Sequence, residues 1–405
     1  MARLSRAESQ EHNRAKVLAA ARDEFAERGF RDAKIDSIAE RAGLTRGGVY
    51  SNFPGKRALY FAVLADLADR APEPPDQEPS LTAREALGAL ARAWVAKLPL
   101  ADTDEPQGTA RLAMDLLPEI QADQLTRRPF AQLMRLDALL LGLALERLRP
   151  RPREHPADTP AGRLERLQPA GDASVEGTRL PDGRAERLSV TAAVDRLEQL
   201  RPPPPQPGRL VRVAEAALTV LHGATRMAAA APGFLEPFNV VRACEQLADL
   251  ELNDSWVVPP FILHAQVVDE PWVPPHVVDA VRKGPARLDA DGVVAVLGLH
   301  RIEAVEEAVR ASPEGVTVAL VTGEADELGP LARLAVAEMC AYLRQAFPAS
   351  AWPRVQVVCD ENGVLARAAG VPAVSDGTEV AVRIQGGRIV LRADGRGACH
   401  AAASR

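Results

Sequence analysis

The sequence predicts a multidomain protein in which an all-α region is followed by an α/β domain. Apolar residues recur at helical spacing from the N-terminus to about residue 252. After Trp256 the spacing changes to short β-branched runs separated by Gly, Pro and Asp. Two proline-rich stretches, Ala71–Pro79 and about 150–207, interrupt the helical region. No helix can cross the first, and in the second only 186–200 looks helical.

These boundaries predict three domains, at residues 1–71, 80–253 and 255–405. The second is expected to be helical and to carry a Pro/Arg-rich insertion at about 150–207. The composition of this insertion does not support a packed core, so we expect it to be partly disordered.

Composition and charge indicate a cytoplasmic globular protein. The 405 residues are 47% hydrophobic and 26% charged, and no apolar stretch approaches the roughly 18 residues of a membrane span. No apolar run follows the N-terminal arginines, so we do not expect a secretory signal. Residues 1–60 hold 12 Lys and Arg against 8 Asp and Glu, a local charge of +4, whereas the whole chain carries −6 and the remainder therefore −10. A basic end on an acidic body is expected if only that end contacts phosphates.

The cysteines give no sign of a metal or disulfide site. Cys244, Cys340, Cys359 and Cys399 are far apart and form no C-x-x-C pair. We therefore expect reduced thiols, and neither a metal nor a cofactor.

Residues 1–70 are predicted to form four short helices. The first ends at Gly29, and a second, shorter apolar stripe ends at Gly43, which supplies a tight turn. Thr45 can cap the third helix, whose core-facing residues are Val49 and Phe53. A helix, a Gly-containing turn and a short polar helix are the geometry that places a recognition helix in the major groove of DNA.

The third helix contains two adjacent glycines, Gly47 and Gly48, each costing roughly 1 kcal/mol relative to Ala. They indicate either a frayed turn or a helix whose backbone approaches DNA closely, and we favour the second. Arg46 can bond guanine O6 and N7, whereas Thr45 is better suited to phosphates. The predicted DNA-binding residues are Lys34, Thr45, Arg46, Gly47, Gly48, Tyr50, Ser51, Asn52 and Lys56.

The segments Phe25–Phe30 and Ile38–Lys56, which read FAERGF and IAERAGLTRGGVYSNFPGK, resemble the DNA-binding domain of the TetR family. In that family the residues matching Tyr50 and Lys56 contact the DNA backbone. Gly55 departs from the usual side-chain cap, but glycine is tolerated at a cap. The resemblance implies a homodimeric transcriptional regulator, commonly a repressor, that binds a palindromic operator, responds to a small-molecule effector and is not an enzyme.

The resemblance also implies that two helices, at 208–231 and 237–252, form a four-helix bundle across the dimer. The alternative is that their apolar faces belong to an intramolecular core. The predicted interface residues are Val211, Leu218, Leu221, Val240 and Leu247.

An effector pocket is expected between the helices of 81–149 and this pair. Its apolar character suggests an uncharged or weakly polar ligand. Ordinary core packing is the alternative for each residue taken singly. The candidate pocket residues are Trp94, Met114, Phe130, Met134, His222 and Met227.

Residues 255–405 alternate between strands and helices, which predicts an α/β layer structure. Strands are expected at 293–299, 316–321 and 355–359, helices at 301–311, 327–347 and 361–369, and a hairpin pairing 379–384 with 388–393.

The segments Asp360–Pro372 and Gly387–Gly395 resemble the later half of thioredoxin-like and peroxiredoxin-like domains, and the thioredoxin-like tail of some flavin-dependent aromatic hydroxylases. The chemistry of that fold needs a low-pKa thiolate at the start of the first helix. His300 stands in that region, without a cysteine, and neither Cys340 nor Cys359 matches the position. We therefore expect a thioredoxin-like domain without redox activity. The alternative is a redox-sensing regulator or an enzyme fusion in which this domain carries thiol chemistry.

Overall fold

The computed structural model describes residues 6–70, 82–98, 112, 115–148, 210–231, 233–252, 264–312 and 314–404. The predicted insertion at 150–207, the proline-rich stretch Ala71–Pro79 and the pocket candidate Met114 lie outside these residues. The described residues before 149 and after 209 pack together as one unit.

The N-terminal helices follow the prediction closely. They are α1 (Arg6–Asp32), α2 (Ile35–Ala42), α3 (Arg46–Tyr50) and α4 (Lys56–Arg70). Gly29, at φ 73°, interrupts α1 where a helix end was expected. Gly43, at φ 65°, closes α2, and its backbone N–H bonds to the carbonyls of Ala39 and Glu40. The expected turn chemistry is confirmed at both glycines.

The helices that follow form the helical body. They are α5 (Ala83–Val95), α7 (Leu116–Ala122), α8 (Gln124–Leu148), α11 (Val211–Ala230) and α12 (Pro237–Leu247). Thr82 and Glu85 form a reciprocal capping box that fixes the start of α5. α11 packs on α8, and α12 packs on α5.

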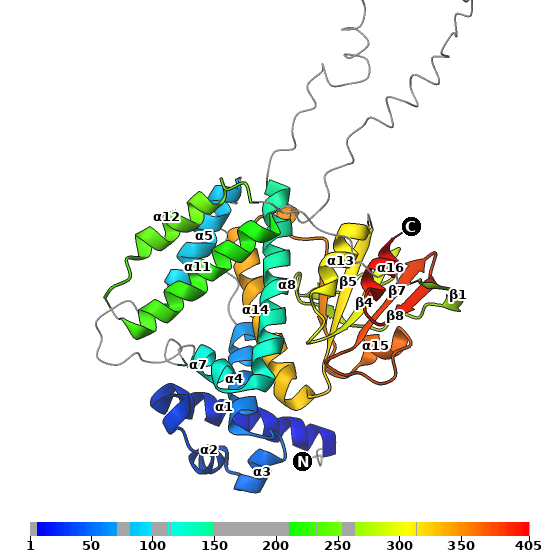
Figure 1. Ribbon diagram of the computed structural model, residues 1–405. Coiled ribbons are helices and arrows are strands. Elements are labelled where there is room, and N and C mark those ends of the chain that lie inside the picture. The colour runs from blue at the N-terminus through cyan, green and yellow to red at the C-terminus, as the bar shows by residue number, and fades with distance from the viewer. Residues whose placement is uncertain are drawn as a thin grey trace, which may run out of the picture. The chain divides into compact units, whose positions relative to one another are not determined.

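A mixed six-stranded sheet follows (Figure 1). Its strands are β1 (Gln266–Pro271), β4 (Gly292–Gly298), β5 (Gly315–Val321), β6 (Gln356–Cys359), β7 (Glu379–Gln385) and β8 (Arg388–Asp394), in the order β1-β8-β7-β4-β5-β6. β4, β5 and β6 are parallel, and β7 and β8 form the predicted antiparallel hairpin. Gly386 and Gly387, at φ 55° and 72°, make its turn. Strands β2 (Val278–Asp279) and β3 (Gly284–Pro285) form a separate ribbon.

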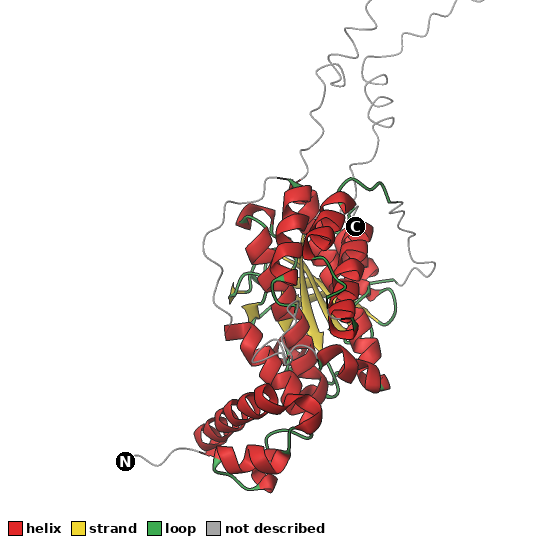
Figure 2. Ribbon diagram, turned by 90° about the vertical axis from the view of Figure 1, so that its left-hand side faces the viewer, coloured by secondary structure: helices red, strands yellow, loops and turns green. Residues whose placement is uncertain are grey.

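Helices pack on both faces of the sheet, and Figure 2 shows helices lying in front of the strands. They are α13 (Ala304–Ala311), α14 (Ala325–Ala346), α15 (Val364–Ala368) and α16 (Ala398–Ala403), with a 3₁₀ turn, η2, at Ala349–Ala351. Successive side chains of β4 point to opposite faces of the sheet and belong to two separate apolar clusters. Val293 and Ala295 share a cluster with α13, α14 and α16, whereas Val294 and Val296 share one with α15 and Trp272.

Helix α14 is buried on more than one side. It contacts β5 and β6, and it also packs against α4, α5 and α8 (Figure 1). Apolar residues therefore surround most of its circumference, as expected for a helix between two layers. The sheet region and the helical body share this helix.

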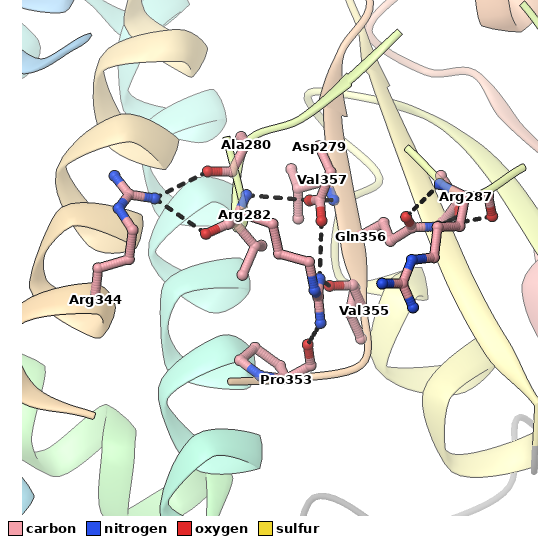
Figure 3. Close-up of polar contacts among 11 residues, drawn as sticks. Asp279, Ala280, Arg282, Arg287, Arg344, Pro353, Val355, Gln356 and Val357 are labelled. Carbon is pink, nitrogen blue, oxygen red and sulfur yellow. Dashed lines mark hydrogen bonds and ion pairs between the residues drawn. The ribbon is translucent and has the colours of Figure 1, made fainter. Parts of the chain in front are cut away.

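A polar network fixes the C-terminal half of α14 to the β2–β3 ribbon (Figure 3). The Arg344 guanidinium donates to the carbonyl oxygens of Ala280 and Val281 at 3.1 and 3.0 Å. The fully buried Asp279 carboxylate accepts the backbone N–H groups of Val281 and Val357 at 3.1 and 3.2 Å. The ribbon is thereby held to both α14 and β6.

Gly142 lets α8 and α11 approach closely. A Cβ there would lie 2.8 Å from the Val211 Cα and 3.0 Å from the Leu210 carbonyl carbon, both backbone atoms. We expect Gly142→Ala to lower the free energy of unfolding by roughly 1–3 kcal/mol, since overpacking forces the helices apart. Gly223→Ala in α11, where a Cβ would meet nothing within 4 Å, is the control and should stabilise by up to about 1 kcal/mol. Urea unfolding measures both, and equal effects would contradict the close-approach argument.

Candidate nucleic-acid interface

Helix α3 is short and is held at both ends. The Thr45 hydroxyl accepts the Gly48 N–H at 3.1 Å, which confirms the predicted N-cap. Val49 and Phe53 are buried, as predicted, and anchor one side of the helix in the core. The opposite side, with Arg46, Gly47 and Tyr50, is exposed.

Arg46 and Tyr50 form an exposed pair on α3. The Arg46 guanidinium carbon lies 5.6 Å from the centre of the Tyr50 ring, and its Nη1 lies 3.5 Å from an Asp36 carboxylate oxygen on α2. Contacts this long between exposed groups contribute little to stability. An external acceptor such as a phosphate or a base edge can therefore replace them at small cost.

Packing within the chain does not require glycine at positions 47 and 48. A Cβ on Gly47 would lie 3.8 Å from the Thr45 Oγ1, and one on Gly48 would lie 3.4 Å from the Leu44 Cβ, both ordinary contacts. The helix thus carries a propensity cost of roughly 1 kcal/mol per glycine without an internal packing reason. A surface that another molecule approaches closely would supply the reason.

Three of the remaining predicted contact residues, Ser51, Asn52 and Lys56, are engaged within the domain. The Ser51 hydroxyl and the Asn52 amide both donate to the Gly48 carbonyl, at 2.9 and 2.8 Å, and so close the helix. The Lys56 ammonium donates to the Arg31 carbonyl at 3.0 Å, and burial lowers its pKa. Lys34 is exposed at the N-cap of α2. DNA contact by these side chains stays a prediction.

The structure adds a buried carboxylate that sequence reasoning missed. Glu24 is fully buried, accepts the Lys34 N–H at 3.3 Å and pairs with Arg28 and Arg41 at 3.2 and 3.4 Å. It fastens α1 to α2 and so sets the position of the turn before α3. A glutamate in an amphipathic helix is usually solvated, so its spacing gave no signal.

Arg14 was also missed. Its guanidinium donates to the Asn52 carbonyl at 3.1 Å and lies 4.4 Å from the centre of the Phe53 ring. It thereby fixes the C-terminal end of α3 against α1.

A cavity with about 870 Å³ of empty space, part of it continuous with solvent, lies among the helices. Trp94, Phe130, Met134 and His222 line it together. Met227 does not line it and is 39% exposed. Sequence reasoning missed the contribution of α14, because it assigned that helix to a later domain. The α14 residues in the lining are Leu331, Leu334, Ala335, Glu338, Met339 and Tyr342.

Aromatic rings and polar groups are mixed in the cavity wall. Trp94 and Tyr342 stack with their centres 5.0 Å apart and their planes at 22°. The Trp94 indole N–H donates to the Thr225 hydroxyl at 2.9 Å. Burial lowers the pKa of His222 to about 4, so its imidazole is neutral at pH 7.

The predicted dimer residues lie within the single chain. Val211, Leu218, Leu221 and Val240 are buried, and Leu247 is half-buried. Their helices pack on α5 and α8, so an intramolecular core accounts for their burial. Contact with a second copy at these positions stays a prediction.

The burial and the pKa values of the four thiols do not favour thiol chemistry. Cys244, Cys340 and Cys399 are buried and Cys359 is half-buried. Burial raises the pKa of Cys244 to about 11 and that of Cys359 to about 12, and it raises those of Cys340 and Cys399 as well. A thiol with such a pKa is a poor nucleophile at pH 7.

In the described part of the chain, no helix combines the length and apolar character that crossing a bilayer requires. Nor does any group of three or more His, Cys, Asp or Glu side chains within these residues have an arrangement that could hold a metal ion.

Comparison with known proteins gives matches at the N-terminus. The family described as "Bacterial regulatory proteins, tetR family" matches residues 17–63. The HTH-type transcriptional regulator SrpR of Pseudomonas putida is 46% identical over 65 residues, which are 16% of this chain and 30% of that protein. The HTH-type transcriptional regulator RutR of Escherichia coli K12 is 42% identical over 53 residues, 13% of this chain and 25% of RutR. The chain thus spans less than a third of the length of these two curated relatives.

Similar solved structures include a TetR transcriptional regulator from Rhodococcus sp. RHA1, at a TM-score of 0.31 and 16% identity, over 62% of this chain and 100% of that one. The structure of RolR in complex with resorcinol aligns at a TM-score of 0.21 and 19% identity, over 62% of this chain and 99% of RolR. Likenesses this low carry no argument about the rest of the chain. The matched segment at 17–63 contains α2, the turn at Gly43 and α3, and it is similar to the N-terminal DNA-binding domain of tetR-family transcriptional regulators.

Proposed function

We propose that the protein is a ligand-responsive transcriptional repressor that binds a palindromic operator as a homodimer and has no enzymatic activity. The observation that carries the proposal is the exposed face of α3, where Arg46 and Tyr50 lie on either side of two glycines that packing does not require. An arginine fork can read guanine in the major groove, and the tyrosine can bond a phosphate.

The packing of α14 supports the ligand response. This helix lines the cavity and also packs along α4, the last helix of the DNA-binding end. Arg57 of α4 pairs with Asp123 at 2.6 Å and with Glu327 of α14 at 3.2 Å. A ligand that shifts α14 would therefore shift α4, and the orientation of α3 with it.

The exposed surface of the α11–α12 pair supports a dimer. Phe234, in the turn between the helices, is 72% exposed, and Phe238, in the first turn of α12, is 77% exposed. Large apolar side chains exposed to this degree and close together in sequence often mark an interface. We assign them to contact with a second copy, which would place two α3 helices on the two halves of an operator.

We further propose that the sheet region is a thioredoxin-like domain that has lost its redox role. Two parallel crossovers followed by a hairpin and a helix support the fold. At the position of the family's thiol, His300 donates its backbone N–H to the Asp376 carbonyl at 2.8 Å. The raised pKa values of the thiols give the redox alternative no support.

The double variant Arg46→Ala, Tyr50→Ala should lose operator affinity by roughly 10- to 100-fold, because it removes one base contact and one phosphate contact. Fluorescence anisotropy with operator DNA at fixed salt measures the loss. The control is Arg396→Ala, which removes one positive charge at an exposed position outside the DNA-binding end and should leave affinity within about twofold. Unchanged affinity in the double variant would show that α3 does not recognise DNA.

Phe238→Glu should weaken the dimer by about tenfold or more, because it places a charge in an apolar contact. Sedimentation velocity over a concentration series gives the dissociation constant. Val273→Glu changes another exposed apolar residue, 75% exposed, in the sheet region and should have no such effect. Equal dissociation constants for Phe238→Glu and Val273→Glu would show that the dimer interface does not include Phe238.

A further inference from the structure

The cavity wall has more acidic than basic side chains. Its ionisable lining residues are Lys97, Asp137, His222, Glu338 and Tyr342. His222 is neutral because its pKa is lowered to about 4, and burial raises the pKa of Tyr342, which stays protonated. Two carboxyl groups therefore face a single ammonium group, that of Lys97.

Lys97 is engaged with the aromatic wall. Its ammonium lies 4.2 Å from the centre of the Tyr342 ring. Burial raises the pKa of Glu338, and the charge of Lys97 opposes that shift. Among the described residues, neither Glu338 nor Asp137 forms an ion pair within 4.0 Å. Lys97 can pair with at most one of the two carboxyl groups.

Asp137 is the carboxyl group left over. It lies in α8, is only 5% exposed, lines the cavity and leaves its Oδ1 without a hydrogen-bond partner. Burial, reinforced by the charge of Glu338, raises its pKa, which favours the neutral acid until a cation lies beside it. A buried polar atom without a partner is costly, so an acceptor kept at a cavity wall is explained if a ligand satisfies it.

The rings around this acceptor suit the same kind of ligand. Trp94 and Tyr342 present a stacked pair, and Phe130 and His222 meet edge-on with their centres 6.2 Å apart. Aromatic faces attract organic cations, and the apolar part of such a ligand would pack on Met134 and Leu334.

We propose that the cavity binds a monocationic amine with an aromatic or apolar body, whose ammonium group donates to the Asp137 carboxylate. This deepens the proposed function, since it names the effector class, and it replaces the sequence-based expectation of an uncharged or weakly polar ligand. Because α14 supplies part of the wall, the sheet region takes part in recognising the amine.

Three small molecules of the same shape separate charge from fit: 2-phenylethylamine, 2-phenylethanol and phenylacetate. Their binding to the full-length protein is measured by isothermal titration calorimetry at pH 7. The amine should bind about tenfold or more tightly than the alcohol, as expected for a hydrogen bond to a charged group, and phenylacetate should bind weakest. Equal or tighter binding of the alcohol would overturn the proposal.

Asp137→Asn keeps the shape of the side chain and removes its charge, so it should abolish the preference for the amine while the protein stays folded. The control Asp394→Asn makes the same change at an exposed position at the end of β8 and should keep the preference. If Asp137→Asn still binds the amine more tightly than the alcohol, Asp137 does not bind the ammonium group. If none of the three molecules binds at millimolar concentration, the cavity is not an amine site; DNA binding, measured without them, would be untouched by that result.

Discussion

The packing of α14 between the sheet and the helical body is the constraint on which the rest of the structure depends. One side of this helix completes the core over β5 and β6, and the other closes the cavity and supports α4. Arg333 of α14 adds a polar tie, since it pairs with Asp69 of α4 and with Glu361 after β6, both at 3.3 Å. Removal of the sheet region would strip α4 of its largest packing partner. The sheet region is therefore part of the machinery that positions the DNA-binding end.

In the DNA-binding end, some polar side chains hold the helices together and others are exposed on the surface. Hydrogen bonds within the domain engage the side chains of Glu24, Arg14 and Lys56. Arg46 and Tyr50 are exposed on α3, and Arg46 makes only a long contact of 3.5 Å with Asp36 and lies over the Tyr50 ring. Rigid support under a small, loosely engaged surface would favour the proposed recognition, because little stability would be lost if DNA replaced the internal contacts.

Local signals made much of the fold predictable. Gly29, Gly43 and Thr45 each determine a helix end through their own backbone or side chain, and Gly386 with Gly387 determines the hairpin. Strand β1 was not predicted, because most of its residues are exposed and lack an alternating apolar pattern.

The sites were predictable only in part. The spacing of Trp94, Phe130 and His222 indicates burial, and they do line one cavity, but spacing cannot name a partner such as α14, which is more than 100 residues away in the chain. Glu24 and Asp137 show the same limit, because a single polar residue in an apolar helix face does not reveal whether it is paired, solvated or aimed into a cavity. Long-range packing decides these cases, and it is not encoded in local periodicity.

The most direct test of the central claim is selection of bound fragments from randomised double-stranded DNA by the full-length protein. Specific recognition through two α3 helices predicts enrichment of one inverted repeat whose half-sites lie about one helical turn apart. Failure to enrich any sequence at physiological salt, with only non-specific binding, would contradict the account.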